Sequence, residues 1–177
     1  MIDRVNRLLL LPLMLVCAGC VQQLQESPAA VSFVRFERMG YAYKLTFVSD
    51  KGFLAAPYAD KLPVVGHWLI CSLVDDTDFS VDHAFSLRRF MRGSTVSADQ
   101  AGKGRQPPFA YSTELNFSET LDGGASDHAL SKTEVDGLLA DRSSIPCKVV
   151  MTITGYRPYY SMIMQVPTAA LLDEVDR

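Results

Sequence analysis

The sequence predicts a mainly β domain, an antiparallel two-layer β-sandwich with one or two short helices. Apolar and polar residues alternate with a period of two through most of the chain after residue 30, which is typical of strands with one buried face. Short turns and polar loops join these segments, whereas repeated βαβ units would need helical crossovers. The same pattern allows an alternative architecture, a single curved antiparallel sheet with a helix packed on it.

The first half of the domain begins with a predicted β-hairpin. Residues 31–38 form a mixed strand, Met39-Gly40 suits a tight reversal, and large apolar residues alternate through 41–49. Residues 50–66 contain two glycines and two prolines and are expected to form a long connection. Residues 67–74 are apolar on both faces, which indicates a strand at the centre of the sheet.

Alternating segments and polar segments follow one another in the middle of the chain. Residues 79–91 alternate and predict a strand, whereas residues 93–108 are weakly hydrophobic and predict a mobile loop. Residues 109–118 show the clearest alternation in the chain and predict a further strand. Residues 121–129 include Asp-Gly-Gly and are expected to form another loop.

The last third of the chain combines a predicted helix with two predicted strands. Ser131-Lys132-Thr133-Glu134 matches a capping box, so a short helix is expected over residues 132–141. Residues 147–156 and 159–166 alternate and predict strands. Residues 167–177 have weak helical periodicity and are expected to form a short helix or a tail.

The first twenty residues form a basic and then apolar segment. Arg4 and Arg7 precede a short apolar run, residues 8–16, and the run ends at Cys17-Ala18-Gly19-Cys20. The run is too short to span a bilayer, which needs about 20 apolar residues of helix. A basic start, a short apolar centre and small residues at its end are typical of a cleaved export signal.

This segment resembles the signal of bacterial lipoproteins, and the resemblance covers residues 1–20 only. It implies cleavage before Cys20 and acylation of the Cys20 thiol, whereas Cys17 departs from the aliphatic residue that the family usually has there. The family's rule for the residue after the acceptor implies the outer membrane, facing the periplasm, because Val21 rather than Asp stands there. An ordinary secretory signal, which would leave a soluble periplasmic protein, is the alternative.

The chain is thereby divided into three predicted parts. Residues 1–19 are the cleaved signal, residues 20–30 the lipidated N-terminus with a flexible tether, and residues 31–177 a single β-rich domain. Loss of the signal removes two arginines and one aspartate, so the net charge changes from −3 to about −4. An acidic chain without a concentrated basic face argues against nucleic acid as a partner.

The four cysteines have different predicted roles. Cys17 leaves with the signal and Cys20 is acylated, which leaves Cys71 and Cys147. Two remaining cysteines in an exported protein most simply form one disulfide bond. A metal or nucleophilic pair has little support, because the sequence has no CxxC spacing and only His67 lies near either cysteine.

No catalytic, cofactor or metal motif is found in the sequence. It contains no HExxH, no GxSxG elbow, no phosphate loop and no dinucleotide fingerprint. His83 falls between apolar residues of a predicted strand and is expected to point inward, and His128 is expected in a solvated loop. The acidic run 75–78 lacks the glycine and glutamate of a calcium-binding EF-hand loop, so a solvated turn is expected there. We therefore expect no cofactor and no bound metal.

Two groups of residues are candidates for an interaction surface: a basic group that would suit lipid headgroups, lipopolysaccharide phosphate or an acidic protein surface, and a tyrosine-rich group that would suit another protein. Three arginines lead into Lys103 and Arg105 of the predicted loop, and tyrosines surround an Arg-Pro turn near residue 157. Tyrosine and arginine are enriched at interface anchors, although solvated strand ends and core tyrosines would give the same pattern. The candidate residues are Arg88, Arg89, Arg92, Tyr156, Arg157 and Tyr159.

Three function classes are compatible with these observations. The leading hypothesis is a lipid-anchored, non-enzymatic envelope protein that binds another envelope protein as an assembly partner or inhibitor. The second is a small envelope hydrolase or carbohydrate-acting enzyme that uses carboxylates or His83, and a pocket joining His83 to a carboxylate would favour it. The third is binding of lipid or glycan between the sheets, which would require an apolar cavity.

Overall fold

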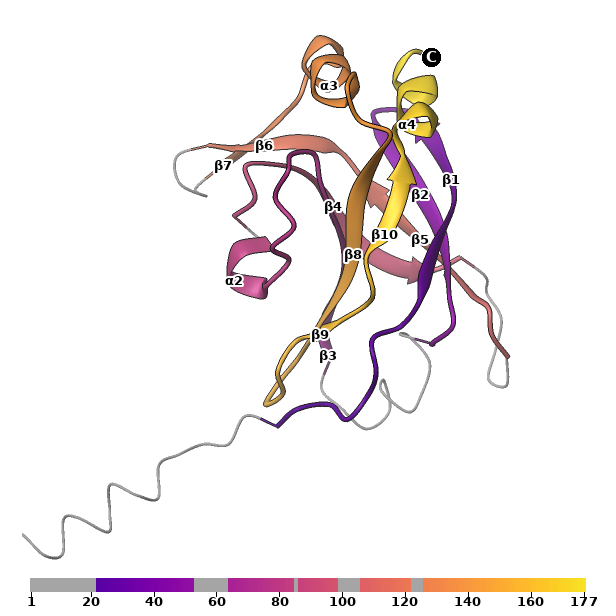
Figure 1. Ribbon diagram of the computed structural model, residues 1–177, viewed down its shortest axis with the longest axis vertical. Helices are drawn as coiled ribbons and strands as arrows, with labels where there is room; N and C mark the ends of the chain where they lie inside the picture. The colour runs from indigo at the N-terminus through magenta and orange to yellow at the C-terminus, as the bar shows by residue number, and fades with distance from the viewer. Residues whose placement is uncertain (1–21, 53–63, 85, 99–105, 122–125) are drawn as a thin grey trace, which may run out of the picture.

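Strand β3 (Val64–Ser72) lies in the interior of the sheet, in agreement with its apolar sequence (Figure 1). In the computed structural model it pairs antiparallel with β4 (Arg89–Ser97) on one side and with β8 (Ser144–Ile153) on the other. Leu69 and Ile70 are both fully buried, in two different apolar clusters. Both faces of its second half, residues 69–72, are therefore covered, which explains why the sequence there does not alternate. The structure describes residues 22–52, 64–84, 86–98, 106–121 and 126–177.

All described strands belong to one antiparallel sheet with a few short helices, which confirms the predicted mainly β class but not the two-layer sandwich. Its main path is β1 (Val31–Met39), β2 (Ala42–Ser49), β5 (Phe109–Leu115), β4, β3, β8 and β10 (Met164–Pro167). Off this path, β6 (Phe117–Leu121) pairs with β4 and with β7 (Ser126–Ala129), and β9 (Tyr159–Tyr160) pairs with β8.

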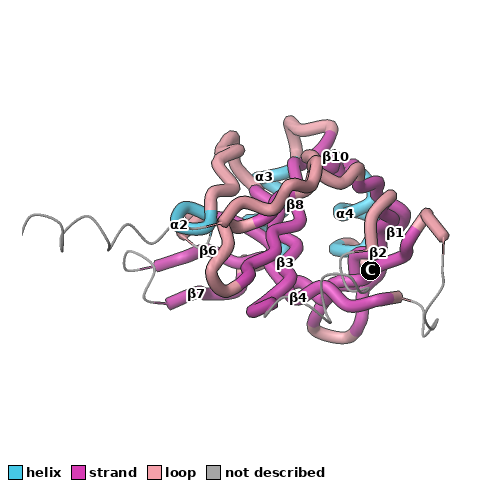
Figure 2. The backbone as a smooth tube through the Cα atoms, turned by 90° about the horizontal axis from the view of Figure 1, so that it is seen from below, coloured by secondary structure: helices cyan, strands magenta, loops and turns pink. Residues whose placement is uncertain are grey.

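The sheet curls until its two end strands, β1 and β10, lie beside each other (Figures 1 and 2). Of the two predicted architectures, a single curved sheet is therefore the closer description. The main core fills the concave side, with Phe47, Leu115 and Val149 among its buried residues.

The predicted hairpin over residues 31–49 is present as β1 and β2. Its turn passes through Gly40, whose φ of 64° lies in the left-handed region that glycine adopts without strain. The predicted capping box is also present, because Ser131 and Glu134 hydrogen-bond reciprocally at the start of helix α3 (Lys132–Leu139). A second helix, α4 (Thr168–Val175), follows β10 directly.

The predicted strand over residues 79–91 is wrong up to Arg88. Helix α2 (Val81–Ala84) occupies part of this stretch, and β4 begins only at Arg89. The side chains of Asp76 and Asp78 accept hydrogen bonds from backbone amides two residues ahead, at 3.0 and 2.9 Å, which favours turns over an extended strand. The apolar residues Phe79, Ala84 and Leu87 are buried against the second face of the sheet instead.

Two predicted loops contain strands. Residues 93–97, expected in the 93–108 loop, complete β4: residues 93 and 94 pair with β3, and residues 95–97 pair with β5. Residues 126–129, expected in the 121–129 loop, form β7. Polar side chains do not prevent pairing in β4, because Thr95 and Thr113 share a buried hydrogen bond of 3.1 Å. The rest of the expected loop over residues 99–105, with Lys103 and Arg105, lies outside the described residues.

The N-terminal segment does not form the predicted flexible tether over residues 22–30. The backbone of Gln22 bonds to Gly155 at 3.2 Å and to Arg157 at 2.8 Å, next to the turn that follows β8. Further along, Ala29 is fully buried and its carbonyl accepts the amide of Met162 at 2.8 Å. This segment is therefore part of the folded domain, because its backbone polar groups are paired with residues far away in sequence.

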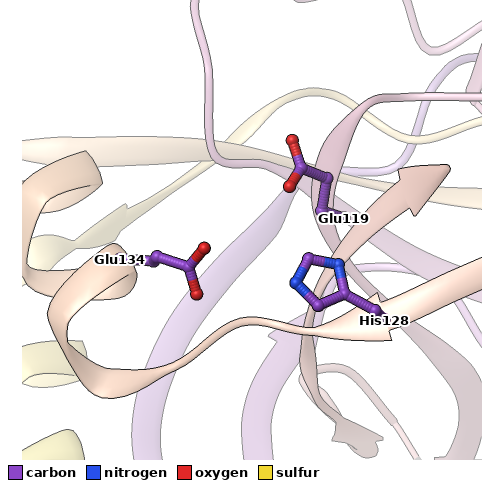
Figure 3. A group of neighbouring side chains, drawn as sticks. All are labelled: Glu119, His128 and Glu134. Atoms are coloured by element: carbon purple, nitrogen blue, oxygen red, sulfur yellow. The ribbon is translucent and has the colours of Figure 1, made fainter.

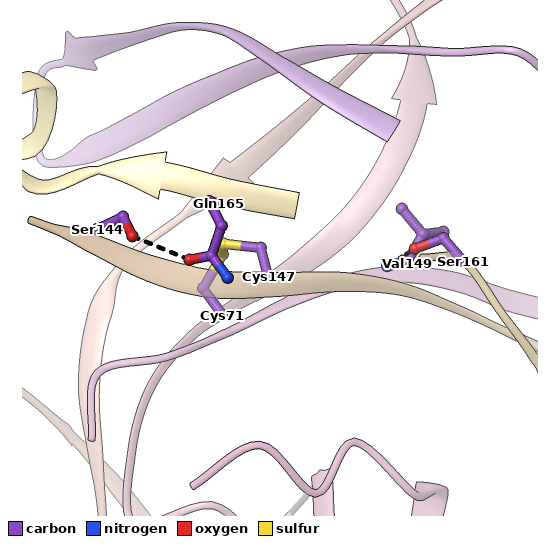
Figure 4. The surroundings of a disulfide bond; sticks show 6 residues. All are labelled: Cys71, Ser144, Cys147, Val149, Ser161 and Gln165. Carbon is purple, nitrogen blue, oxygen red and sulfur yellow. Dashed lines mark hydrogen bonds between the residues drawn. A yellow bond between two sulfur atoms is a disulfide. The ribbon is translucent and has the colours of Figure 1, made fainter. Parts of the chain in front are cut away.

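The predicted disulfide between Cys71 and Cys147 is present in the core (Figure 4). The two residues lie directly opposite each other in the β3–β8 ladder, with 4.0 Å between their Cα atoms, and both are fully buried. Nearby, the Ser161 hydroxyl accepts the amide of Val149 at 2.9 Å (Figure 4). The covalent link therefore reinforces the centre of the sheet.

Cys71→Ala should lower the free energy of unfolding by about 4 kcal/mol, because the disulfide restricts the unfolded chain. The two cysteines are 76 residues apart, which makes the restricted loop long. Urea denaturation of the oxidised wild type and the variant measures the difference, and reduced wild type is the matched control. Peptide mapping that finds both thiols free in unreduced wild type would contradict this prediction.

Gly93 and Gly137 should respond in opposite ways to substitution by alanine. A Cβ at Gly93 would lie 2.0 Å from the carbonyl oxygen of Glu114 on β5, whereas a Cβ at Gly137 in α3 would meet nothing within 4 Å. Gly93→Ala should destabilise the domain by about 1–3 kcal/mol. Gly137→Ala should stabilise it by up to about 1 kcal/mol, because alanine is the better helix former. Equal effects in urea denaturation would show that β4 and β5 do not approach this closely.

Candidate functional site

The three arginines of the predicted basic patch are paired with acidic residues. The Nε atoms of Arg88 and Arg89 both donate to Oε1 of Glu119, at 3.0 and 3.1 Å, and Arg92 donates to Asp127 at 3.0 Å. These ion pairs join the start of β4 to β6 and β7. The arginines therefore belong to a mixed-charge cluster rather than to a basic surface.

Glu119 is the first member of a group of three side chains that converge beside this cluster (Figure 3). His128 lies opposite Glu119 in the β6–β7 ladder, and Glu134 comes from the first turn of α3. One donor atom from each residue lies within 4.8 Å of the other two. The three residues come from three successive elements, so the β6–β7 hairpin and the capping box together position them.

Hydrogen bonds and charges keep both carboxylates ionised. Burial alone would raise the pKa of Glu119, but the hydrogen bonds and charges of Arg88 and Arg89 hold it below its usual range. The pKa of Glu134 is also lowered, chiefly by the hydrogen bond from the Ser131 side chain and then by that from the Ser131 amide. Two negative charges therefore face the imidazole of His128 at neutral pH.

Sequence reasoning did not find this group. The sequence predicts a solvated loop around His128 and a helix-capping role for Glu134. The spacing of the three residues matches no metal or catalytic motif, since the chain reverses twice between the first and the last. The capping box was the one available signal, because it fixes the direction of the Glu134 side chain.

The predicted tyrosine–arginine surface lies in a different part of the domain. Tyr156, Arg157 and Tyr159 surround the turn between β8 and β9, away from the β6–β7 hairpin (Figure 1). Tyr159 is buried, its hydroxyl donates to the carbonyl of Ser27 at 2.8 Å, and burial raises its pKa to about 12. Tyr159 therefore holds the N-terminal segment in place, and Arg157 is the exposed member of the three.

A groove of about 430 Å³ runs between the N-terminal segment and this turn. Its walls combine apolar and polar side chains, with Arg157 on one side and Glu26 on the other. The lining residues are Gln23, Leu24, Glu26, Pro28, Arg157, Pro158, Tyr159 and Tyr160. The groove exists because residues 22–28 are ordered on the domain.

His83 does not point inward as predicted, because α2 rather than a strand carries it. Its side chain is 40% exposed, and its Nε2 lies 2.5 Å from Oδ2 of Asp76. The hydrogen bond that the His83 imidazole donates to Asp76 raises the pKa of His83, and the same bond lowers the pKa of Asp76. The pair lies outside the groove described above and closes the turn before α2.

No protein-family model matches the chain, and comparison with curated proteins and with solved structures finds no similar protein. No helix among the described residues is long and apolar enough to cross a membrane. The possible roles of the groove and of the group formed by Glu119, His128 and Glu134 therefore follow from their own geometry and chemistry.

The His83–Asp76 pair should make stability depend on pH. The folded pKa of His83 is raised. Its contribution to the free energy of unfolding is therefore present below the pKa of the unfolded chain, about 6.5, and is lost as the pH rises through the pKa of the folded protein. The folded pKa of Asp76 is lowered. Its contribution to the free energy of unfolding is therefore present above the pKa of the unfolded chain, about 3.9, and is lost as the pH falls through the pKa of the folded protein.

The stability difference between wild type and Asp76→Asn should therefore be largest between about pH 4 and 6.5 and smaller at pH 8.5. Urea denaturation at several pH values measures it. In an NMR titration, the midpoint of His83 should move to lower pH in the variant. An unchanged midpoint would show that Asp76 does not hold the imidazole in solution.

Proposed function

We propose that the protein is a lipid-anchored envelope protein that lies directly on the outer membrane and binds another envelope protein through the groove beside Arg157. The observation that carries this proposal is the ordered attachment of Gln22 to the turn after β8. The lipoprotein-like signal supports export and acylation at Cys20. A disulfide in the core supports an oxidising compartment.

The position of Gln22 limits how far the domain can move from an anchor at Cys20. Only Val21 lies between the two residues, so their Cα atoms are at most about 7 Å apart in an extended chain. A free tether over residues 20–30 would have allowed about 35 Å. An acylated Cys20 would therefore bring the turn between β8 and β9, with the exposed Arg157, to the lipid headgroups. Each basic side chain near an anionic membrane surface adds roughly 1 kcal/mol of attraction.

The groove fits an extended protein segment better than a compact ligand. Apolar side chains from Leu24, Pro28 and Pro158 line it, together with the charged side chains of Arg157 and Glu26. The Glu26 carboxylate is ion-paired with Lys51 at 3.1 Å. Interface sites typically combine such an apolar surface with a few polar groups that fix the orientation of the partner. The groove would lie close to the membrane, so the partner would be an envelope protein that is itself membrane-associated.

The two alternative functions have less support. An enzyme that uses His83 as a base would need the imidazole to face a cleft, and the His83–Asp76 pair does not line the groove. Binding of lipid or glycan inside the curled sheet would need space that Phe47, Leu115 and Val149 fill as buried core residues.

The anchor is tested by Cys20→Ser, with Cys17→Ser as the matched control. We expect Cys20→Ser to move the protein from the membrane fraction to the soluble periplasmic fraction and to remove the acyl mass. Cys17→Ser should leave the membrane localisation and the acyl mass unchanged, because the proposed acylation site is Cys20 and not Cys17. Membrane retention of an unacylated Cys20→Ser protein would contradict the anchor.

Partner binding is tested in the same cells with a photo-crosslinking residue at position 157 or, as a control, at Tyr41. Tyr41 is fully exposed at the turn between β1 and β2, the end of that hairpin opposite Val31 and the N-terminal segment. We expect the probe at position 157 to yield a discrete covalent complex with another envelope protein. The same products from both probes, or none from position 157, would argue against the groove as a binding site without affecting the anchor.

A further inference from the structure

The convergence of Glu119, His128 and Glu134 points to a ligand that the proposed function does not use. Their donor atoms come from β6, β7 and α3, and the three side chains point toward one another (Figure 3). Nδ1 of His128 is buried and has no hydrogen-bond partner in the described part of the chain. Buried polar atoms are nearly always paired, so a histidine of this group that leaves its Nδ1 unpaired needs a physical explanation.

Each carboxylate is oriented through one oxygen, and the second oxygen is left unused. Oε1 of Glu119 accepts both arginines, and Oε2 of Glu134 accepts the amide and hydroxyl of Ser131. No hydrogen bond to Oε2 of Glu119 or Oε1 of Glu134 is found among the described residues. Outer hydrogen bonds of this kind orient ligand carboxylates in metal sites.

We propose that Glu119, His128 and Glu134 bind one divalent transition-metal ion, with Zn²⁺ as the best fit. Two carboxylate oxygens and one imidazole nitrogen form a three-ligand zinc set that leaves a fourth position for water. Ca²⁺ fits less well, because it takes six to eight oxygen ligands and no imidazole.

The distances and charges are compatible with this ion. Ligand atoms about 2.0–2.1 Å from a tetrahedral zinc lie about 3.4 Å from one another, so donors already within 4.8 Å need only a small contraction. The guanidinium groups of Arg88 and Arg89 oppose a cation. The Arg88 side chain is 75% exposed, so water and salt screen its charge, and the two ionised carboxylates offset the charge of the ion.

The proposal is tested with the full mature protein after treatment with a chelator. Equilibrium dialysis against Zn²⁺ with elemental analysis should give one ion per chain. Because loss of an outer hydrogen-bond partner already weakens metal binding by about 10- to 100-fold, His128→Gln should raise the Kd by at least about 100-fold. His83→Gln is the matched control and should leave the Kd unchanged, since His83 contacts Asp76 elsewhere.

Two further measurements keep the result independent of misfolding. Near-UV circular dichroism of His128→Gln should match that of wild type, and Glu134→Gln, which retains an oxygen for the capping box, should also weaken Zn²⁺ binding. Co²⁺ in place of Zn²⁺ should give visible absorption bands of a four-coordinate N/O site in wild type alone. The proposal is overturned if wild type binds no stoichiometric Zn²⁺, or if folded His128→Gln binds it as tightly as wild type.

Discussion

The structure depends on an interior strand whose second half is buried on both faces and which is covalently joined to its neighbour. β3 carries Leu69 into the main core and Ile70 into the second cluster, and Cys71 links it to Cys147 of β8. A strand covered on both sides requires a layer of chain on each side. The curled sheet supplies one layer, and the segment around α2 supplies the other, so both features follow from this constraint.

Much of the fold could be predicted from the sequence, because the spacing of apolar and polar residues within a segment indicates which of its side chains are buried. The hairpin of β1 and β2, the capping box of α3 and the pairing of Cys71 with Cys147 all followed from short-range spacing or from cysteine count. The wrong strand over residues 79–88 has a physical cause. Residues 79–88 alternate like a strand, yet their apolar side chains cover the outside of the sheet from a turn and a short helix. The spacing of apolar residues indicates which side chains are buried, but it does not indicate which part of the protein covers them.

The candidate sites were less predictable, because they depend on contacts between distant residues. The arginines at positions 88 and 89 looked like a basic patch until β6 placed Glu119 beside them. His128 acquired its neighbours only through the reversal between β6 and β7. Likewise, residues 22–28 have no periodicity, and their order comes from hydrogen bonds to a turn more than a hundred residues later.

The long-range contacts of the N-terminal segment determine when this segment can fold relative to synthesis of the chain. Gln22 bonds to residues 155 and 157, the Ala29 carbonyl accepts the Met162 amide, and Glu174 accepts the amide of Arg38. The first strand and the segment before it therefore cannot reach their final positions until nearly the whole polypeptide has been synthesised. Folding that relies on such distant pairings is slow. The domain therefore closes late, after β8 and the segments that follow it are available to pair with the N-terminal segment.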